Sequence, residues 1–335
     1  MGSSPEYMFH LILSYRWPTL NRPQKLCDNA NYPTPLLPIF ASLLHSKILT
    51  DEPGSEQHFE ATTGVIVDEF PLIPFSHSTR FLTTVLLILL IENGKVLYHF
   101  NEQKVQMFLG QIKPIMKTQL IKILQPALNR SEMLVNRFAT ANFNFDHLLA
   151  DFRDVMKMNR DSFKFGTRIN NFVMGVFLQI FEVSMINKIM SNPDRFCFSN
   201  AMMWNSFLSA FENDERLSLP NIRNYISALI MAQAISEKPE MKNDICPELD
   251  SRLVAYIIGH YKKDMNITHT LKIKPYLKKF KLKSAPSKFN PLPEPDKFEI
   301  SDIAESLNLT NWCVCNKDEE CVNVYSYIAS YCKNE

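Results

Sequence analysis

Residues 172–187 read FVMGVFLQIFEVSMIN, and this stretch decides the fold. Its apolar residues recur at intervals of three and four, which places them on one face of an α-helix. Such a stripe predicts a helix that packs against a protein core. Because core helices occur in proteins of every function, the residues that follow the stripe carry the functional information.

The rest of the chain predicts further helices and no strand of useful length. Helical spacing of apolar residues gives about ten helices, and the run from Phe81 to Ile91 is about half the length that crosses a bilayer, so it predicts a buried helix. We expect a helix over residues 101–124 that Pro114 kinks or breaks. The predicted fold class is therefore all-α, as an elongated stack of antiparallel helical bundles.

Composition excludes several functional classes. The chain has 335 residues, with 46% hydrophobic and 21% charged residues, which is typical of a soluble globular protein. It has only 8 glycines and lacks a Walker-type loop, a dinucleotide-binding fingerprint and a zinc-protease motif. The histidines are scattered, with no spacing that suggests a nucleophile and its base. We therefore expect no enzyme activity and no cofactor.

Charge and cysteine usage give further expectations. A net charge of +1 offers no global reason to bind nucleic acid directly. Seven cysteines at irregular spacing fit a cytoplasmic protein better than a disulfide framework. Four of them lie near the C-terminus: Cys313, Cys315, Cys321 and Cys332. A zinc site is the less favoured interpretation because only one pair is close in sequence, so we expect reduced cysteines in a C-terminal helix or loop.

A particular order of residues accompanies and follows the stripe. Its members are Gln179, Phe181, Asn187, Phe198, Ser199, Cys246, Leu249 and Tyr261. This succession, the dilute-like motif, resembles the dilute domain, a helical binding module. Dilute domains are found in the globular cargo-binding tails of class V myosins and in junction scaffolds of the afadin or small-GTPase effector kind. The chain departs from the family pattern where a tryptophan often follows the position of Leu208, because Phe211 lies there and Trp204 lies earlier.

Weaker similarities extend the resemblance on both sides. Residues 76–82 resemble the start of a helix in these tails, and Gln119-Leu120 resembles the helix that follows it. Past the core, Phe289-Asn290-Pro291 and residues 298–309 resemble the extended segment and last helix of a myosin V tail. These later matches favour the myosin branch.

The resemblance implies two tightly packed subdomains and an extended C-terminal strap. We expect a cloning remnant at residues 1–7 and an N-terminal helical subdomain at 8–165. A dilute-like subdomain is expected at 166–288, and a strap with a last helix at 289–335, packing back on the first subdomain. Asn187 is polar at a position that the stripe makes buried, so its side-chain amide should bond to a neighbouring backbone group.

The function implied is that of a cargo-binding tail of a class V-like myosin. Such a module docks adaptor or cargo-receptor proteins, or Rab-like small GTPases, and so links an actin motor to its load. Its expected location is the cytoplasm, with the actin cytoskeleton and cargo organelles. The alternative implied by the same resemblance is a dilute-domain scaffold at membranes or junctions.

One charged cluster is a candidate binding face. Lys278, Lys279, Lys281 and Lys283 lie nearly side by side in sequence, and we call them the lysine cluster. The cluster is either a solvated surface or a face for an acidic partner, such as an anionic membrane, an adaptor peptide or a motor head.

Overall fold

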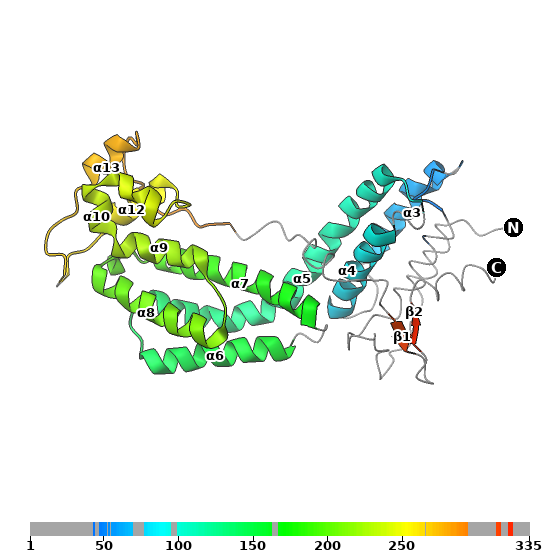
Figure 1. The fold of residues 1–335 in the computed structure, drawn as a ribbon, viewed down its shortest axis with the longest axis horizontal. Helices are drawn as coiled ribbons and strands as arrows, with labels where there is room; N and C mark the ends of the chain where they lie inside the picture. The colour runs from blue at the N-terminus through cyan, green and yellow to red at the C-terminus, as the bar shows by residue number, and fades with distance from the viewer. Residues whose placement is uncertain are drawn as a thin grey trace. The chain divides into compact units, whose positions relative to one another are not determined.

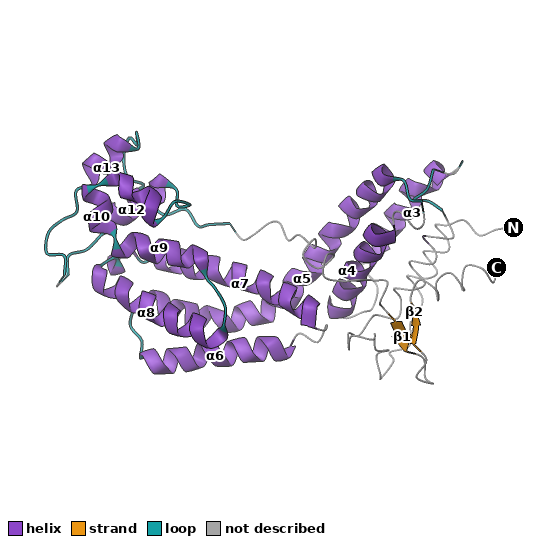
Figure 2. Cartoon of the chain, viewed as in Figure 1, coloured by secondary structure: helices purple, strands orange, loops and turns teal. Residues whose placement is uncertain are grey.

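The computed structural model describes residues 43, 47–51, 53, 55–69, 77–94, 99–162, 167–264, 266–293, 313–315 and 321–323. These residues are predominantly helical, which confirms the all-α class (Figure 2). Within the expected strap and last helix, 289–335, residues 294–312, 316–320 and 324–335 lie outside the described residues, and Cys332 is one of them.

The C-terminal cysteines correct one expectation. Two three-residue strands, β1 (Cys313–Cys315) and β2 (Cys321–Asn323), pair antiparallel with Cys315 opposite Cys321. Cys313, Cys315 and Cys321 therefore lie in strands and not in a helix or loop. Val314 pairs with Val322 in the register of the two strands, and β-branched residues favour a pleated strand.

The chain forms two compact units. Unit 1 comprises Met1–Gln125, Phe163–Val173 and Phe298–Glu335, and unit 2 comprises Pro126–Ser162 and Met174–Lys297. Unit 1 contains α3 (Ser55–Glu69), α4 (His77–Gly94) and the first part of α5 (Glu102–Ala139). Unit 2 therefore takes residues 126–162, which the sequence placed in the N-terminal subdomain.

Unit 2 holds most of the remaining helices. In chain order its later elements are α6 (Phe145–Ser162), most of α7 (Thr167–Met190), η2 (Pro193–Arg195), α8 (Phe198–Glu215), α9 (Pro220–Ile230), α10 (Ala232–Glu237), η3 (Pro239–Met241), α11 (Lys242–Ile245), α12 (Ser251–His260) and α13 (Ile273–Lys279). Helix α8 packs against α6 and α9 (Figure 1). The short helices α10, α12 and α13 pack together beside α9 (Figure 1).

Helix α5 is longer than the sequence predicted. It runs unbroken from Glu102 to Ala139, through both Pro114 and Pro126, so of the two effects expected of Pro114, a kink or a break, the break is wrong. A proline removes one backbone donor but leaves the apolar face intact. That face is buried on both sides of Pro114, at Phe108 and Leu120 among others, and its packing outweighs the lost hydrogen bond.

The core of unit 2 is built around the fully buried Trp204 of α8. Its indole Nε1 donates to the backbone oxygen of Phe138 in α5, at 2.8 Å. The ring of Phe207 lies 5.2 Å from the rings of Phe138 and of Phe152 in α6. Phe152 in turn lies 5.6 Å from Phe181 of α7. Aromatic contacts thus join the four long helices of this unit.

Helix α7 serves as a core helix of this unit. Residues Asn170–Met190 are long and apolar enough to cross a membrane by length and composition alone, and 56% of that window is buried inside the protein. Glu182, in the middle of the helix, is buried and hydrogen-bonded to α9. A buried carboxylate that accepts a hydrogen bond from a neighbouring helix indicates that α7 packs inside the protein and does not lie in lipid.

Candidate functional site

The eight residues of the dilute-like motif all lie in unit 2. Phe181, Cys246, Leu249 and Tyr261 are buried, whereas Gln179 and Ser199 are exposed. The motif therefore combines core positions with polar positions at the surface. Asn187 and Ser199 are the informative members, because their side-chain bonds join segments that are far apart in sequence.

Asn187 holds an extended segment against α7. Its Nδ2 donates to the backbone oxygen of Leu292 at 3.0 Å, and its Oδ1 accepts from the backbone nitrogen of Leu292 at 2.7 Å. The expected bond from this amide to backbone is confirmed, although its partner lies 105 residues further on. Leu292 lies between Pro291 and Pro293, and a residue that precedes proline favours an extended conformation.

The same extended segment packs on α12. Phe289 lies 6.1 Å from the ring of Tyr256, whose hydroxyl donates to the backbone oxygen of Met190. A side chain at Gly259 would come within 3.4 Å of Ala285 and within 3.1 Å of Ile273. The segment that follows α13 therefore lies on α12 and reaches the end of α7. The described residues 289–293 belong to unit 2 and lie against α7 and α12 of the same unit.

Ser199, the second residue of α8, is hydrogen-bonded to a carboxylate from a distant part of the sequence. Its backbone nitrogen and its hydroxyl both donate to Oδ2 of Asp264, at 2.8 and 3.0 Å. Oδ1 of Asp264 accepts from the backbone nitrogens of Asn266 and Ile267. Desolvation works to raise the pKa of Asp264, but these hydrogen bonds outweigh it and hold the pKa below its ordinary value. The carboxylate thus fixes the chain after α12 to the start of α8.

The two cysteines described in unit 2 are not activated. Burial raises the pKa of the Cys246 thiol, and burial together with the charge of Asp264 raises that of Cys197. A nucleophilic cysteine requires the opposite shift, because the thiolate is the reactive form. Within the described ranges no group of three or more histidine, cysteine or acidic side chains could hold a metal ion.

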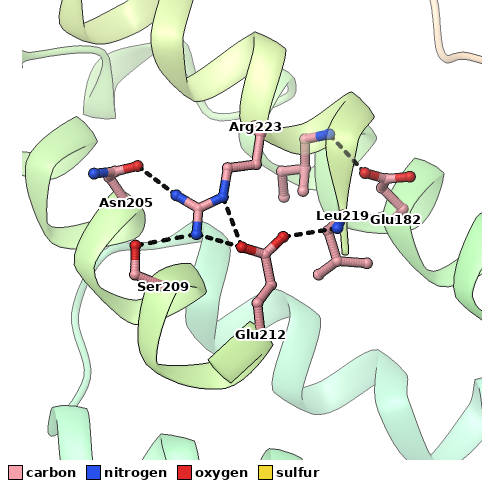
Figure 3. Close-up of polar contacts among 7 residues, drawn as sticks. Glu182, Asn205, Ser209, Glu212, Leu219 and Arg223 are labelled. Atoms are coloured by element: carbon pink, nitrogen blue, oxygen red, sulfur yellow. Dashed lines mark hydrogen bonds and ion pairs between the residues drawn. The ribbon is translucent and has the colours of Figure 1, made fainter. Parts of the chain in front are cut away.

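A polar cluster at the start of α9 was not found from the sequence (Figure 3). The guanidinium of Arg223 donates twice to Glu212 and once each to Asn205 and Ser209 of α8. The other oxygen of Glu212 accepts from the backbone nitrogen of Leu219 at 2.7 Å. Because partners within the protein take up the guanidinium and the carboxylate, the cluster ties α8 to α9.

Glu182 lies beside this cluster and caps α9 (Figure 3). It accepts from the backbone nitrogen of Ile222 at 2.9 Å and from Nδ2 of Asn221 at 2.8 Å. Burial raises its pKa even though both hydrogen bonds oppose the shift. The signal in the sequence was a charged residue within the apolar stretch, next to Phe181, which usually means a buried partner.

The lysine cluster lies on α13 and the turn after it. All four side chains are exposed, and within the described ranges none forms an ion pair. Lys278 and Lys279 occupy the last turn of α13, where cations are favoured by the helix dipole. Helix stabilisation accounts for these two lysines but not for Lys281 and Lys283.

In unit 1 a side-chain contact joins two of the segments that more weakly resemble these tails, residues 76–82 and Gln119-Leu120. Nδ1 of His77, at the start of α4, lies 2.8 Å from Oε1 of Gln119, which is buried in α5. The histidine therefore positions the start of α4 against α5.

Comparison with family models gives no match for this chain, and comparison with curated proteins gives none either.

Proposed function

We propose that this chain is a cargo-binding module similar to the globular tail of class V myosins, and that it docks adaptor proteins or Rab-like small GTPases. The observation that carries the proposal is the dilute-like motif together with the role of Asn187. This motif residue binds the extended segment that follows Phe289-Asn290-Pro291, the second place where the sequence resembles a myosin V tail.

The chemistry of the described residues supports binding more than catalysis. The polar groups described above are taken up by helix caps, by bonds between α8 and α9 and by the bond to Leu292. In a binding module, affinity comes from a few buried apolar anchors in a groove or along an exposed edge. A rigid stack of helices supplies such surfaces without moving on binding.

The proposed location is the cytoplasm, where the module would link an actin motor to organelles. The test is affinity purification from cytosol with the purified chain, in parallel samples loaded with a non-hydrolysable GTP analogue or with GDP. Each protein recovered is then expressed, purified and tested for direct binding.

The proposal expects direct binding of a Rab-like GTPase that prefers the GTP form, or of an organelle adaptor. Recovery of junctional proteins or Ras-like GTPases that bind directly would replace it with the scaffold alternative. Failure of every purified candidate to bind would refute it.

A further inference from the structure

The most unusual charge distribution in the chain lies in residues 272–288, which we call the basic segment. It contains the lysine cluster and three more lysines: Lys272, Lys274 and Lys288. No aspartate or glutamate occurs between residues 265 and 293. Since the whole chain has a net charge of only +1, the positive charge is concentrated here and the remainder is net acidic.

The structure leaves these charges uncompensated. All seven lysine side chains are exposed, and within the described ranges none takes part in an ion pair. Among the described residues, the nearest acid in sequence is Asp264, which is engaged by Ser199, Asn266 and Ile267. Uncompensated like charges repel one another, so a face of this kind gains most from an anionic partner.

The base of the basic segment is fixed to the protein. Tyr276 of α13 is fully buried, and its hydroxyl donates to the backbone oxygen of Ser251 at 3.1 Å. Its ring stacks on Phe280 at 4.7 Å. The lysines therefore extend from a packed helix and its turn, and a partner would not have to order the backbone beneath them.

Lys281 lies at a position that glycine would normally occupy. The end of α13 forms a Schellman motif, in which Leu282 N donates to Leu277 O at 2.8 Å and Lys281 N donates to Lys278 O at 3.2 Å. Lys281 has a φ of 55°, which is strained for any residue with a side chain. The chain thus carries a charge here at a conformational cost, as residues at binding sites often do.

We propose that the basic segment binds the surface of an anionic lipid bilayer. All seven charges are lysines, and no arginine occurs after Arg252. Arginine is favoured where a defined phosphate or carboxylate is gripped through two bonds, whereas lysine is a flexible point charge. In a fluid bilayer the anionic lipids can move to the lysines, so separate point charges on flexible side chains suit such a surface. A peptide partner offers acidic groups at fixed positions, which such charges suit less well. Clusters of four to eight basic residues bind anionic leaflets in this way.

This inference goes beyond cargo docking and does not rest on it. Membrane contact through the basic segment would orient unit 2 at a bilayer whichever protein partner it binds. Each lysine near an anionic surface strengthens binding about fivefold, so the whole segment suffices for salt-sensitive attachment.

The test is co-sedimentation of the purified chain with vesicles of phosphatidylcholine alone or mixed with phosphatidylserine. We expect binding only to the mixed vesicles, with loss of binding as salt is raised. The double variant Lys278→Gln/Lys279→Gln should weaken binding about 25-fold. A matched control, Lys157→Gln/Lys238→Gln, removes two exposed lysines outside the basic segment and should weaken it less than about twofold.

Lys281→Gly separates binding from folding. Glycine relieves the strained turn, so the variant should unfold at the same or a higher temperature while binding mixed vesicles about fivefold more weakly. Equal binding to both kinds of vesicle, or equal losses in the lysine variants and their control, would overturn the proposal. So would binding of a polyglutamate peptide or an RNA oligonucleotide without binding to mixed vesicles, since either would assign the segment to another class of partner.

Discussion

Replacing Asn187 with alanine should release the extended segment around Leu292 while leaving the helices folded. The alanine removes both bonds between the side-chain amide and the Leu292 backbone. Each hydrogen bond contributes about 0.5–1.5 kcal/mol net, so the segment should lose about 1–3 kcal/mol of protection against local opening. That loss corresponds to an opening equilibrium about 5 to 150 times larger.

Amide hydrogen exchange measures this opening directly. Leu292 has the only backbone N–H in the stretch 291–293, because both its neighbours are prolines. Its exchange should accelerate about 5- to 150-fold in Asn187→Ala, whereas amides around Trp204 in the core should keep their rates.

Two further variants complete the experiment. Asn187→Asp keeps an acceptor for the Leu292 N–H but places a negative oxygen near the Leu292 carbonyl, so it should not restore protection. Asn192→Ala is the matched control, since Asn192 lies just past the end of α7 and its side-chain amide donates to the backbone oxygen of Lys188, four residues earlier, at 2.6 Å. Unchanged exchange at Leu292 in Asn187→Ala, or the same acceleration in the control, would refute the role given to Asn187.

Three other predictions concern unit 2. Trp204→Phe removes the indole donor to the carbonyl of Phe138, which keeps its bond from the backbone nitrogen of Ala141 at 3.1 Å, so urea denaturation should show a loss of about 0.5–1.5 kcal/mol; an unchanged stability would mean that the bond at 2.8 Å adds nothing. Arg216 ends α8 with a φ of 52° and its side chain is exposed, so Arg216→Gly should raise stability by roughly 1 kcal/mol, and a lower melting temperature would contradict the strain argument. Burial raises the pKa of Glu182 above its ordinary 4.5, so the folded state binds its proton more tightly than the unfolded state does. The stability that Glu182 contributes should therefore fall as pH rises from about 4.5 through its folded pKa, and Glu182→Gln should flatten that part of the pH profile; parallel profiles for the two proteins would contradict it.

Local sequence signals predicted the features that depend on local structure. Spacing of apolar residues found α7. The polar bond of Asn187 was also predicted, because a buried amide must find a partner. Its partner, 105 residues away, could not be predicted from local pattern.

Features that depend on packing were the ones missed. Pro114 predicted a kink or a break, and the buried faces on both sides of it keep α5 continuous. Glu182 and Arg223 gave no distinctive spacing, since their partners come from neighbouring helices. The strain at Lys281 depends on how α13 ends, which nothing in the sequence marks because glycine is absent there. Strands β1 and β2 have only three residues each, which is too few for an alternating pattern to predict a strand.

Cargo docking is tested most directly by titrating the purified chain with purified Rab-like GTPases and organelle adaptors, followed by calorimetry. The account predicts saturable binding of one partner of this kind, and for a GTPase at least about tenfold tighter binding of the GTP form, a difference of about 1.4 kcal/mol. Binding should persist in Lys278→Gln/Lys279→Gln, because the basic segment serves a separate surface. No binding by any member of either class would contradict the account, even if the chain bound anionic vesicles as proposed.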